Sequence, residues 1–142
     1  MRQFARLSLF TFCALSLTGC ISFDRREQNQ LRELRSLGIS QTDRGIKHPA
    51  LAGALNLFWG FGNFYLASGR YHKNELDMWT FGALNLILWP LSILWGVPEG
   101  AIDANSINKI ETIHYYYYDP MGRAELERIK RERGVPTAPP PG

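Results

Sequence analysis

Cys20 is the residue whose chemistry the sequence defines most clearly. It ends the run Leu17-Thr18-Gly19-Cys20, which follows a basic start and an apolar stretch over residues 7–17. A basic region, an apolar region and a small residue before the cut are the parts of a secretory signal. A cysteine at the cut adds the sulfur on which a lipid thioether is made. The pattern therefore predicts a bacterial lipobox, with the signal peptide 1–19 removed and Cys20 carrying fatty chains such as palmitate. An uncleaved transmembrane anchor is the alternative, but the apolar stretch is short for a bilayer.

Catalytic chemistry has little support elsewhere in the sequence. Glu99 and Asp103 lie four residues apart, a spacing that places two carboxylates side by side on a helix, and His114 follows further along. The sequence shows no nucleophile beside them, no second histidine at metal-ligand spacing and no glycine-rich phosphate loop. The other cysteine, Cys13, leaves with the signal peptide. We therefore expect no enzymatic activity, no cofactor, no metal and no small-molecule substrate.

Charge and length narrow the class of protein further. The formal charge of +3 falls to +1 when the signal peptide, which holds two arginines, is removed. This balance gives no reason to expect nucleic acid as a partner. The mature chain has 123 residues, which suits one small unit with tails.

Two uncharged segments of 21 residues each, 49–69 and 78–98, dominate the mature sequence. As helices of about 1.5 Å per residue they extend about 31 Å, close to the roughly 30 Å hydrocarbon core of a bilayer. The alternative is a pair of core helices in a soluble protein, but the remaining segments are too short and polar to cover them. We predict an all-α fold, a membrane-inserted two-helix hairpin of transmembrane helices over residues 49–98. Pro90 predicts a kink in the second helix and Pro98 its end.

A five-residue repeat, Gly-Ala-Leu-Asn-Leu, occurs once in each segment, at residues 53–57 and 82–86. Small residues allow helices to approach closely, and asparagine side chains seek hydrogen-bond partners in lipid. We expect Asn56 and Asn85 to bond across the hairpin, or, less simply, to line a solute path in an oligomer. The residues predicted to pack the hairpin are Gly53, Asn56, Gly60, Gly62, Gly82 and Asn85.

The region of residues 47–108 resembles the TM-two domain family, a pair of membrane helices joined by a short turn. The residues that carry the resemblance are Gly60, Gly62, Phe64, Tyr65, Leu66, Gly69 and Asp103. The chain as a whole is similar to small bacterial lipoproteins that carry such a hairpin. The resemblance implies a membrane protein with two helices.

The segments flanking the hairpin have helical patterns. In residues 20–48, Asp24 and Glu27 form a capping-box pattern before leucines at three-residue steps, and Gly38 ends the helix. Its arginines, Arg25, Arg26, Arg32 and Arg35, contact lipid headgroups or are simply solvated.

The segment 99–134 predicts two helices, one that leaves the membrane and ends in four tyrosines, and a charged one that opens at Asp119-Pro120. The tyrosines form either an aromatic contact surface or a membrane-boundary anchor. The charged helix is a solvated face or a docking surface for an envelope partner. Residues 135–142 predict a flexible, proline-rich tail.

The sequence is compatible with two arrangements of the hairpin in the membrane. Acylation takes place on the outer face of the inner membrane, so a spanning hairpin leaves both flanking segments in the periplasm and sends the turn between the helices into the cytoplasm. The positive-inside rule opposes this, because more basic residues lie before the hairpin than in its turn. A shallower, re-entrant hairpin removes the conflict. We favour the inner membrane over the outer one.

We predict a non-enzymatic, lipid-anchored protein of the cell envelope with a structural, assembly or protein-interaction role. Its partners are membrane lipid and either a second copy of the chain or an envelope protein complex. The alternative is an oligomeric transport or permeabilising element.

Overall fold

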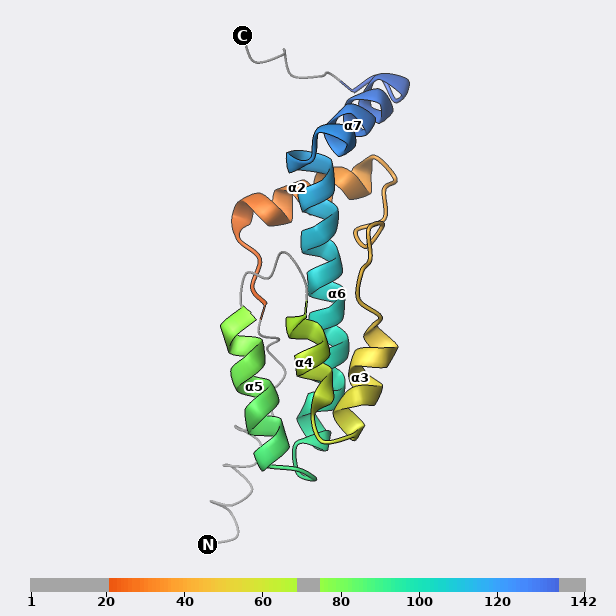
Figure 1. The fold of residues 1–142 in the computed structure, drawn as a ribbon. Coiled ribbons are helices and arrows are strands. Elements are labelled where there is room, and N and C mark those ends of the chain that lie inside the picture. The colour runs from red at the N-terminus through yellow and green to blue at the C-terminus, as the bar shows by residue number, and fades with distance from the viewer. Residues whose placement is uncertain (1–20, 69–74, 136–142) are drawn as a thin grey trace, which may run out of the picture. The chain divides into compact units, whose positions relative to one another are not determined.

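The computed structural model describes the chain over residues 21–68 and 75–135 (Figure 1). All regular elements in these ranges are helices, so the all-α fold class is confirmed for them. The helices are α2 (Arg25–Ser36), α3 (Pro49–Leu57), α4 (Phe61–Ala67), α5 (Glu75–Ile87), α6 (Ile93–Tyr118) and α7 (Pro120–Glu132). The predicted lipobox, Leu17, Thr18, Gly19 and Cys20, and most of the proline-rich tail lie outside the described residues.

The chain divides into two compact units. The first, here the apolar unit, includes residues 47–107 and with them α3, α4, α5 and the first part of α6. The second, here the polar unit, consists of residues 23–46 and the chain from residue 108 onward, with α2, the second part of α6 and α7.

The first uncharged segment contains two helices and the second contains parts of two, so the expectation of one continuous helix per segment is wrong. In the first segment Trp59 and Gly60 both adopt left-handed backbone, with φ of 56° and 77°, and this turn separates α3 from α4. In the second segment α5 ends at Ile87 and α6 begins at Ile93, with Pro90 between them. Pro90 lacks the N–H that a continuous helix requires.

Pro98 was expected to end the second helix, and it lies inside α6 instead. Its missing N–H removes one backbone hydrogen bond near the start of a long helix. The helix continues through Pro98, and Gly96 and Gly100 on either side of it lie close to Asn56 of α3. Among the described residues, none of the helices is both long enough and apolar enough to cross a bilayer.

The apolar unit consists of two helical hairpins, α3–α4 and α5–α6, whose turns lie at the same end of the unit (Figure 1). The ring centroids of Trp59 and Trp89, one from each turn, are 6.0 Å apart in an edge-on arrangement. The indole Nε1 of Trp89 donates to the carbonyl of Leu57 at 3.5 Å. The chain therefore enters and leaves both hairpins at the end opposite these tryptophans.

The helix boundaries of the polar unit agree with the sequence. The Asp24 carboxylate accepts from Glu27 N at 2.7 Å while Asp24 N donates to Glu27 Oε2 at 2.8 Å, so the capping box is confirmed. Asp119 likewise accepts from the first backbone amides of α7. Gly38 and Gly134 follow α2 and α7 with a φ of 66° each, a conformation that glycine adopts without strain.

Candidate membrane-binding surface and its polar interior

The exterior of the apolar unit is covered with large apolar side chains. Leu94, Ile87 and Phe58 are the most exposed, at 79%, 77% and 68%. Others on the exterior are Leu51, Leu57, Trp59, Phe61, Trp79, Phe81, Leu84, Leu86, Leu88, Trp89 and Leu91. Single exposed apolar residues are normal on a soluble protein, but a surface made of them marks a contact with lipid or with protein.

The interior of the same unit contains polar side chains beside apolar ones such as Leu66 and Met78. Asn56, Asn85 and Asp103 are fully buried, with at most 1% of their surface exposed. Asn63, Ser92, Glu99 and Ser106 of this unit are buried as well. Soluble domains expose fewer large apolar side chains and bury fewer polar ones, because water solvates polar groups and excludes apolar ones. An apolar exterior around polar contacts matches a helical bundle in hydrocarbon.

The two repeat asparagines occupy the interface of three helices. Asn56 Nδ2 donates to the Gly96 carbonyl of α6 and to Asn63 Oδ1 of α4, the latter at 3.3 Å. Asn85 Oδ1 accepts from Trp95 Nε1 at 2.9 Å, and the Asn85 carbonyl accepts from Ser92 Oγ at 2.9 Å. Both asparagines therefore bond across helices, and α6 is their common partner.

The glycines predicted to pack the hairpin all lie at close contacts between helices or turns. A methyl group at Gly53 would lie 3.1 Å from the Val97 carbonyl, and one at Gly62 would lie 2.5 Å from Asn56 Cγ and closer still to the Ala52 carbonyl. At Gly60 the methyl group would meet Asn85 Cβ at 2.5 Å, and at Gly82 the Phe64 ring at 2.9 Å.

Gly96 and Gly100 also pack the unit, and sequence reasoning missed them. A methyl group at Gly100 would lie 2.6 Å from Asn56 Nδ2 and 3.2 Å from the Ala52 carbonyl. Together they form a Gly-x-x-x-Gly pattern, the spacing that brings two small residues onto one helix face against a neighbour. That pattern is the signal that could have found them.

Lys47 lies at the end of the apolar unit that is opposite Trp59 and Trp89. Its Nζ donates to the Tyr65 carbonyl at 2.6 Å and to the Ser68 carbonyl and hydroxyl, the hydroxyl at 3.1 Å. These carbonyls are the last ones of α4, where a cation satisfies unpaired acceptors and the negative end of the helix dipole. The charged group therefore lies at the base of the hairpins, away from their turns.

The tyrosine run belongs to the interior of the polar unit. Tyr115, Tyr116 and Tyr117 each donate their hydroxyl to a carboxylate: to Glu125 at 3.0 Å, Asp43 at 2.9 Å and Glu33 at 2.7 Å. These carboxylates come from α7, from the segment after α2 and from α2 itself. The run therefore joins three parts of the chain to α6. It does not form the free aromatic surface that the sequence left open, because only Tyr118 of the four tyrosines is exposed.

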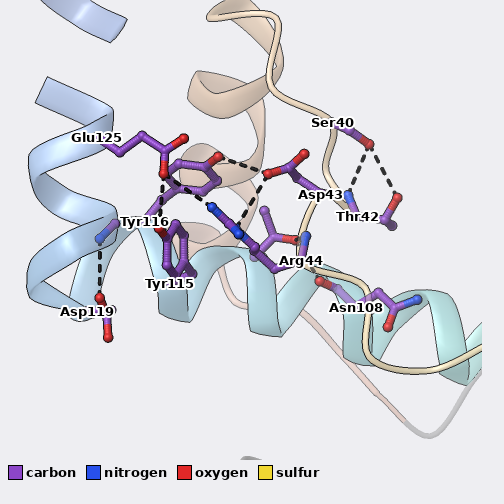
Figure 2. A network of polar contacts seen from close by, with 11 residues as sticks. Ser40, Thr42, Asp43, Arg44, Asn108, Tyr115, Tyr116, Asp119 and Glu125 are labelled. Atoms are coloured by element: carbon purple, nitrogen blue, oxygen red, sulfur yellow. Dashed lines mark hydrogen bonds and ion pairs between the residues drawn. The ribbon is translucent and has the colours of Figure 1, made fainter. Parts of the chain in front are cut away.

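Arg44 lies between Glu125 and Asp43, the carboxylates that accept from Tyr115 and Tyr116, as Figure 2 shows. Its guanidinium lies 3.9 Å from the centroid of the Tyr115 ring and 3.2 Å from Glu125 Oε2. Burial raises the pKa of Tyr116 to about 12, and its hydrogen bond to Asp43 adds to the effect. The pKa of Tyr117 is raised for the same two reasons, burial and its bond to Glu33. Both hydroxyls therefore remain protonated donors at neutral pH.

The residues considered for acid–base chemistry are divided between the units. Glu99 and Asp103 lie on the buried side of α6 in the apolar unit. His114 lies in the polar unit, where its ring centroid is 5.7 Å from that of Tyr118. Among the described residues, no group of three or more histidine, cysteine or acidic side chains has the arrangement of a metal site.

The sequence matches no protein-family model, no curated protein and no solved structure. The similarity to the TM-two domain stays a prediction.

Proposed function

We propose that this chain is a non-enzymatic, lipid-anchored protein of the bacterial envelope, whose apolar unit is embedded in one leaflet of a membrane. The observation that carries the proposal is the exterior of the apolar unit, which exposes leucines, phenylalanines and tryptophans while asparagines are buried inside. The polar unit then supplies a helical surface for an envelope protein or a second copy of the chain.

The helix lengths favour re-entrant hairpins over spanning ones. The 9 residues of α3 extend about 14 Å and the 13 residues of α5 about 20 Å, whereas half of a hydrocarbon core measures about 15 Å. Each hairpin thus has the depth of about one leaflet. Entry and exit at the same end also remove the conflict with the positive-inside rule, because no charged segment has to cross.

Burial of the turns in hydrocarbon requires that their polar groups have partners. Trp89 Nε1 is satisfied by the Leu57 carbonyl, and the two indole rings pack on each other. At the opposite end, Lys47 and the predicted lipid on Cys20 belong at the headgroups. We assign the inner membrane, where acylation takes place, as the location, and fractionation of the two membranes tests this assignment.

Depth-dependent quenching tests the embedding directly. Two single-tryptophan variants of the mature protein, with the other indoles replaced by phenylalanine, keep either Trp89 in the turn or Trp79 near the start of α5. The eight steps from Trp79 to the end of α5 at Ile87 correspond to about 12 Å along the helix, and Trp89 follows in the turn. In vesicles of lipids brominated at defined depths, we expect Trp89 to be quenched most by bromines near the chain ends and Trp79 by bromines near the headgroups. Quenching of Trp89 by shallow bromines alone would contradict the proposal.

The lipid anchor has its own test. Mass spectrometry of the mature protein should find an N-terminal Cys20 bearing a diacylglycerol, and a Cys20→Ser variant should retain the uncut signal peptide. A full-length, unacylated wild-type chain recovered from cells would exclude the lipoprotein assignment.

The transport alternative needs Asn56 and Asn85 to face an interior shared between copies. Both side chains are fully buried within a single chain, in contact with Gly96 of α6. This arrangement favours the structural or assembly role over a pore.

A further inference from the structure

The exposed charge of the polar unit is mainly positive. Among its described residues, three acidic side chains are exposed, and these are Asp24, Asp43 and Glu132. Nine arginines are exposed in the same part of the chain: Arg25, Arg26, Arg32, Arg35, Arg44, Arg123, Arg128, Arg131 and Arg133. The surface of the polar unit is therefore basic, although the whole chain has a formal charge of only +3.

The outer face of α2 carries arginines with no acidic residue among them. Arg25 and Arg32, two turns apart, lie on the side of the helix opposite the buried Leu34. Arg26 and Arg35 lie at the two edges of this face. The other exposed residues on the face are uncharged: Gln28, Asn29 and Ser36. The outer face of α2 is therefore purely cationic.

Both carboxylates of α2 have partners inside the polar unit. Glu27 accepts from the N-cap amide of the helix at 2.8 Å. Glu33 accepts from the Tyr117 hydroxyl at 2.7 Å and lies 2.8 Å from Lys130 Nζ. These two carboxylates therefore do not neutralise the outer face.

The positions of the arginines are unfavourable for the helix by itself. Arg25 and Arg26 occupy the first turn of α2, where the positive end of the helix dipole repels cations. Arg32 and Arg35 are three residues apart, a spacing at which like charges repel each other. Arg25 and Arg32 have neither a hydrogen bond nor an ion pair with any residue that the structure describes. An anionic ligand on this face would remove both sources of repulsion.

The phosphate of an anionic phospholipid fits this face. A guanidinium can donate two parallel hydrogen bonds to phosphate oxygens. Arg25 is five residues from Cys20, which is at most about 18 Å along an extended chain. With the lipid of Cys20 in the membrane, the first turn of α2 therefore lies within reach of the headgroups.

We propose that the outer face of α2 binds anionic phospholipid headgroups and thereby holds the polar unit at the membrane surface. This inference rests on the lipid anchor of the proposed function, because the anchor brings α2 to the headgroups. It does not depend on the depth of the apolar unit.

Modification of arginines by phenylglyoxal, followed residue by residue with mass spectrometry, tests the inference. The acylated mature protein is reconstituted into vesicles of phosphatidylcholine, either pure or with about a third phosphatidylglycerol. The attraction of one arginine to an anionic surface corresponds to a factor of about five, so Arg25 and Arg32 should react about fivefold more slowly in the anionic vesicles. High salt should remove most of this protection.

The arginines of α7 are the internal control. Arg123 and Arg131 are exposed, and α7 packs on the buried side of α2 through Leu126. Their reaction rates should change by less than about twofold between the two kinds of vesicle. Equal slowing of the α2 and α7 arginines would overturn the inference.

Quenching of Trp89 by deep bromines, measured in the same two lipid mixtures, separates the inference from the proposed function. Unchanged rates at Arg25 and Arg32 together with deep quenching would overturn the inference and leave the proposed function standing. Slowed rates at these arginines without deep quenching would overturn the embedding of the apolar unit and leave the inference standing.

A matched pair of double variants assigns the binding to α2. Arg25→Gln/Arg32→Gln and Arg123→Gln/Arg131→Gln each remove two exposed cations, so both variants have the same net charge. Arg35, at the edge of the outer face of α2, serves as the reporter. Its protection in anionic vesicles should fall below about twofold in the first variant and should equal that of the wild type in the second. Equal loss of protection in both variants would exclude the outer face of α2 as the binding surface.

Discussion

Replacement of Gly62 by alanine tests the contact between α3 and α4 that holds the first hairpin closed. The added methyl group would lie 2.5 Å from Asn56 Cγ and closer to the Ala52 carbonyl, which is backbone and cannot rotate away. To restore an ordinary contact, α3 and α4 must separate by about 1 Å. Asn56 is then displaced from its bonds to Asn63 and Gly96.

The expected cost follows from two opposing effects. Overpacking of this kind destabilises by about 1–3 kcal/mol, and the change from glycine to alanine in a helix returns up to about 1 kcal/mol. We expect a net loss of about 1–2 kcal/mol for Gly62→Ala. Gly96→Ala is the matched control, because its methyl group would meet the movable Asn85 amide at 3.3 Å. That variant should remain within about 0.5 kcal/mol of the wild type.

Reversible unfolding in mixed micelles, followed by circular dichroism, measures both variants on the same scale. Hydrogen exchange adds a local reading: amides of α3 and α4 should exchange faster in Gly62→Ala, while those of α7 should not change. Equal stability of the two variants would refute the close contact between α3 and α4.

Three further predictions concern the polar unit. Because the folded pKa of Tyr116, about 12, exceeds the ordinary value of about 10, its stabilisation is complete below pH 10 and is lost as the pH rises toward 12. Alkaline unfolding should therefore be less steep in Tyr116→Phe, with one tyrosinate absorbance step missing. Burial raises the pKa of Glu33, but hydrogen bonds from Lys130 and Tyr117 outweigh it and the net pKa is lowered. The free energy of unfolding that Glu33 contributes is thus lost as the pH falls below about 4. In Lys130→Met, stability should fall less on acidification than in the wild type, by a difference of less than about 1 kcal/mol, as measured by urea unfolding. Asp24→Ala removes the carboxylate that accepts from the Glu27 amide, while the backbone N–H of residue 24 still donates to Glu27 Oε2, and it should destabilise α2 by about 1 kcal/mol, seen as faster exchange of the Glu27 amide.

The features that the sequence predicted correctly are local ones. The capping box of Asp24 and Glu27 closes within three residues, and the glycines after α2 and α7 stop helices through their own backbone. Such signals act between neighbours in the chain, so their residue types are sufficient to identify them.

The breaks in the apolar segments were missed for a physical reason. Hydropathy and segment length say how much apolar surface a segment has, and they do not say where its backbone turns. The first turn needs left-handed backbone at Trp59, which a tryptophan rarely adopts. That conformation is accompanied by a contact with Trp89, thirty residues away, which no local pattern displays.

The tyrosine run shows the same limit. A sequence of four tyrosines indicates amphipathic rings, at a membrane boundary or in a contact surface. Which carboxylates accept from them depends on how distant segments return to α6. The partners of Tyr116 and Tyr117 lie 73 and 84 positions away in the chain.

The division of the polar unit between residues 23–46 and residues 108 onward dictates an order of assembly. Each hairpin of the apolar unit closes between neighbouring segments, which keeps the entropic cost of loop closure small and the folding rate high. The polar unit has to wait, because α2 emerges from the ribosome long before α7, whose Leu126 belongs to the same core as Leu34 and Leu37. The leucines of α2 therefore stay without their native neighbours until the last helix has been synthesised, and during this interval they are exposed to other apolar surfaces.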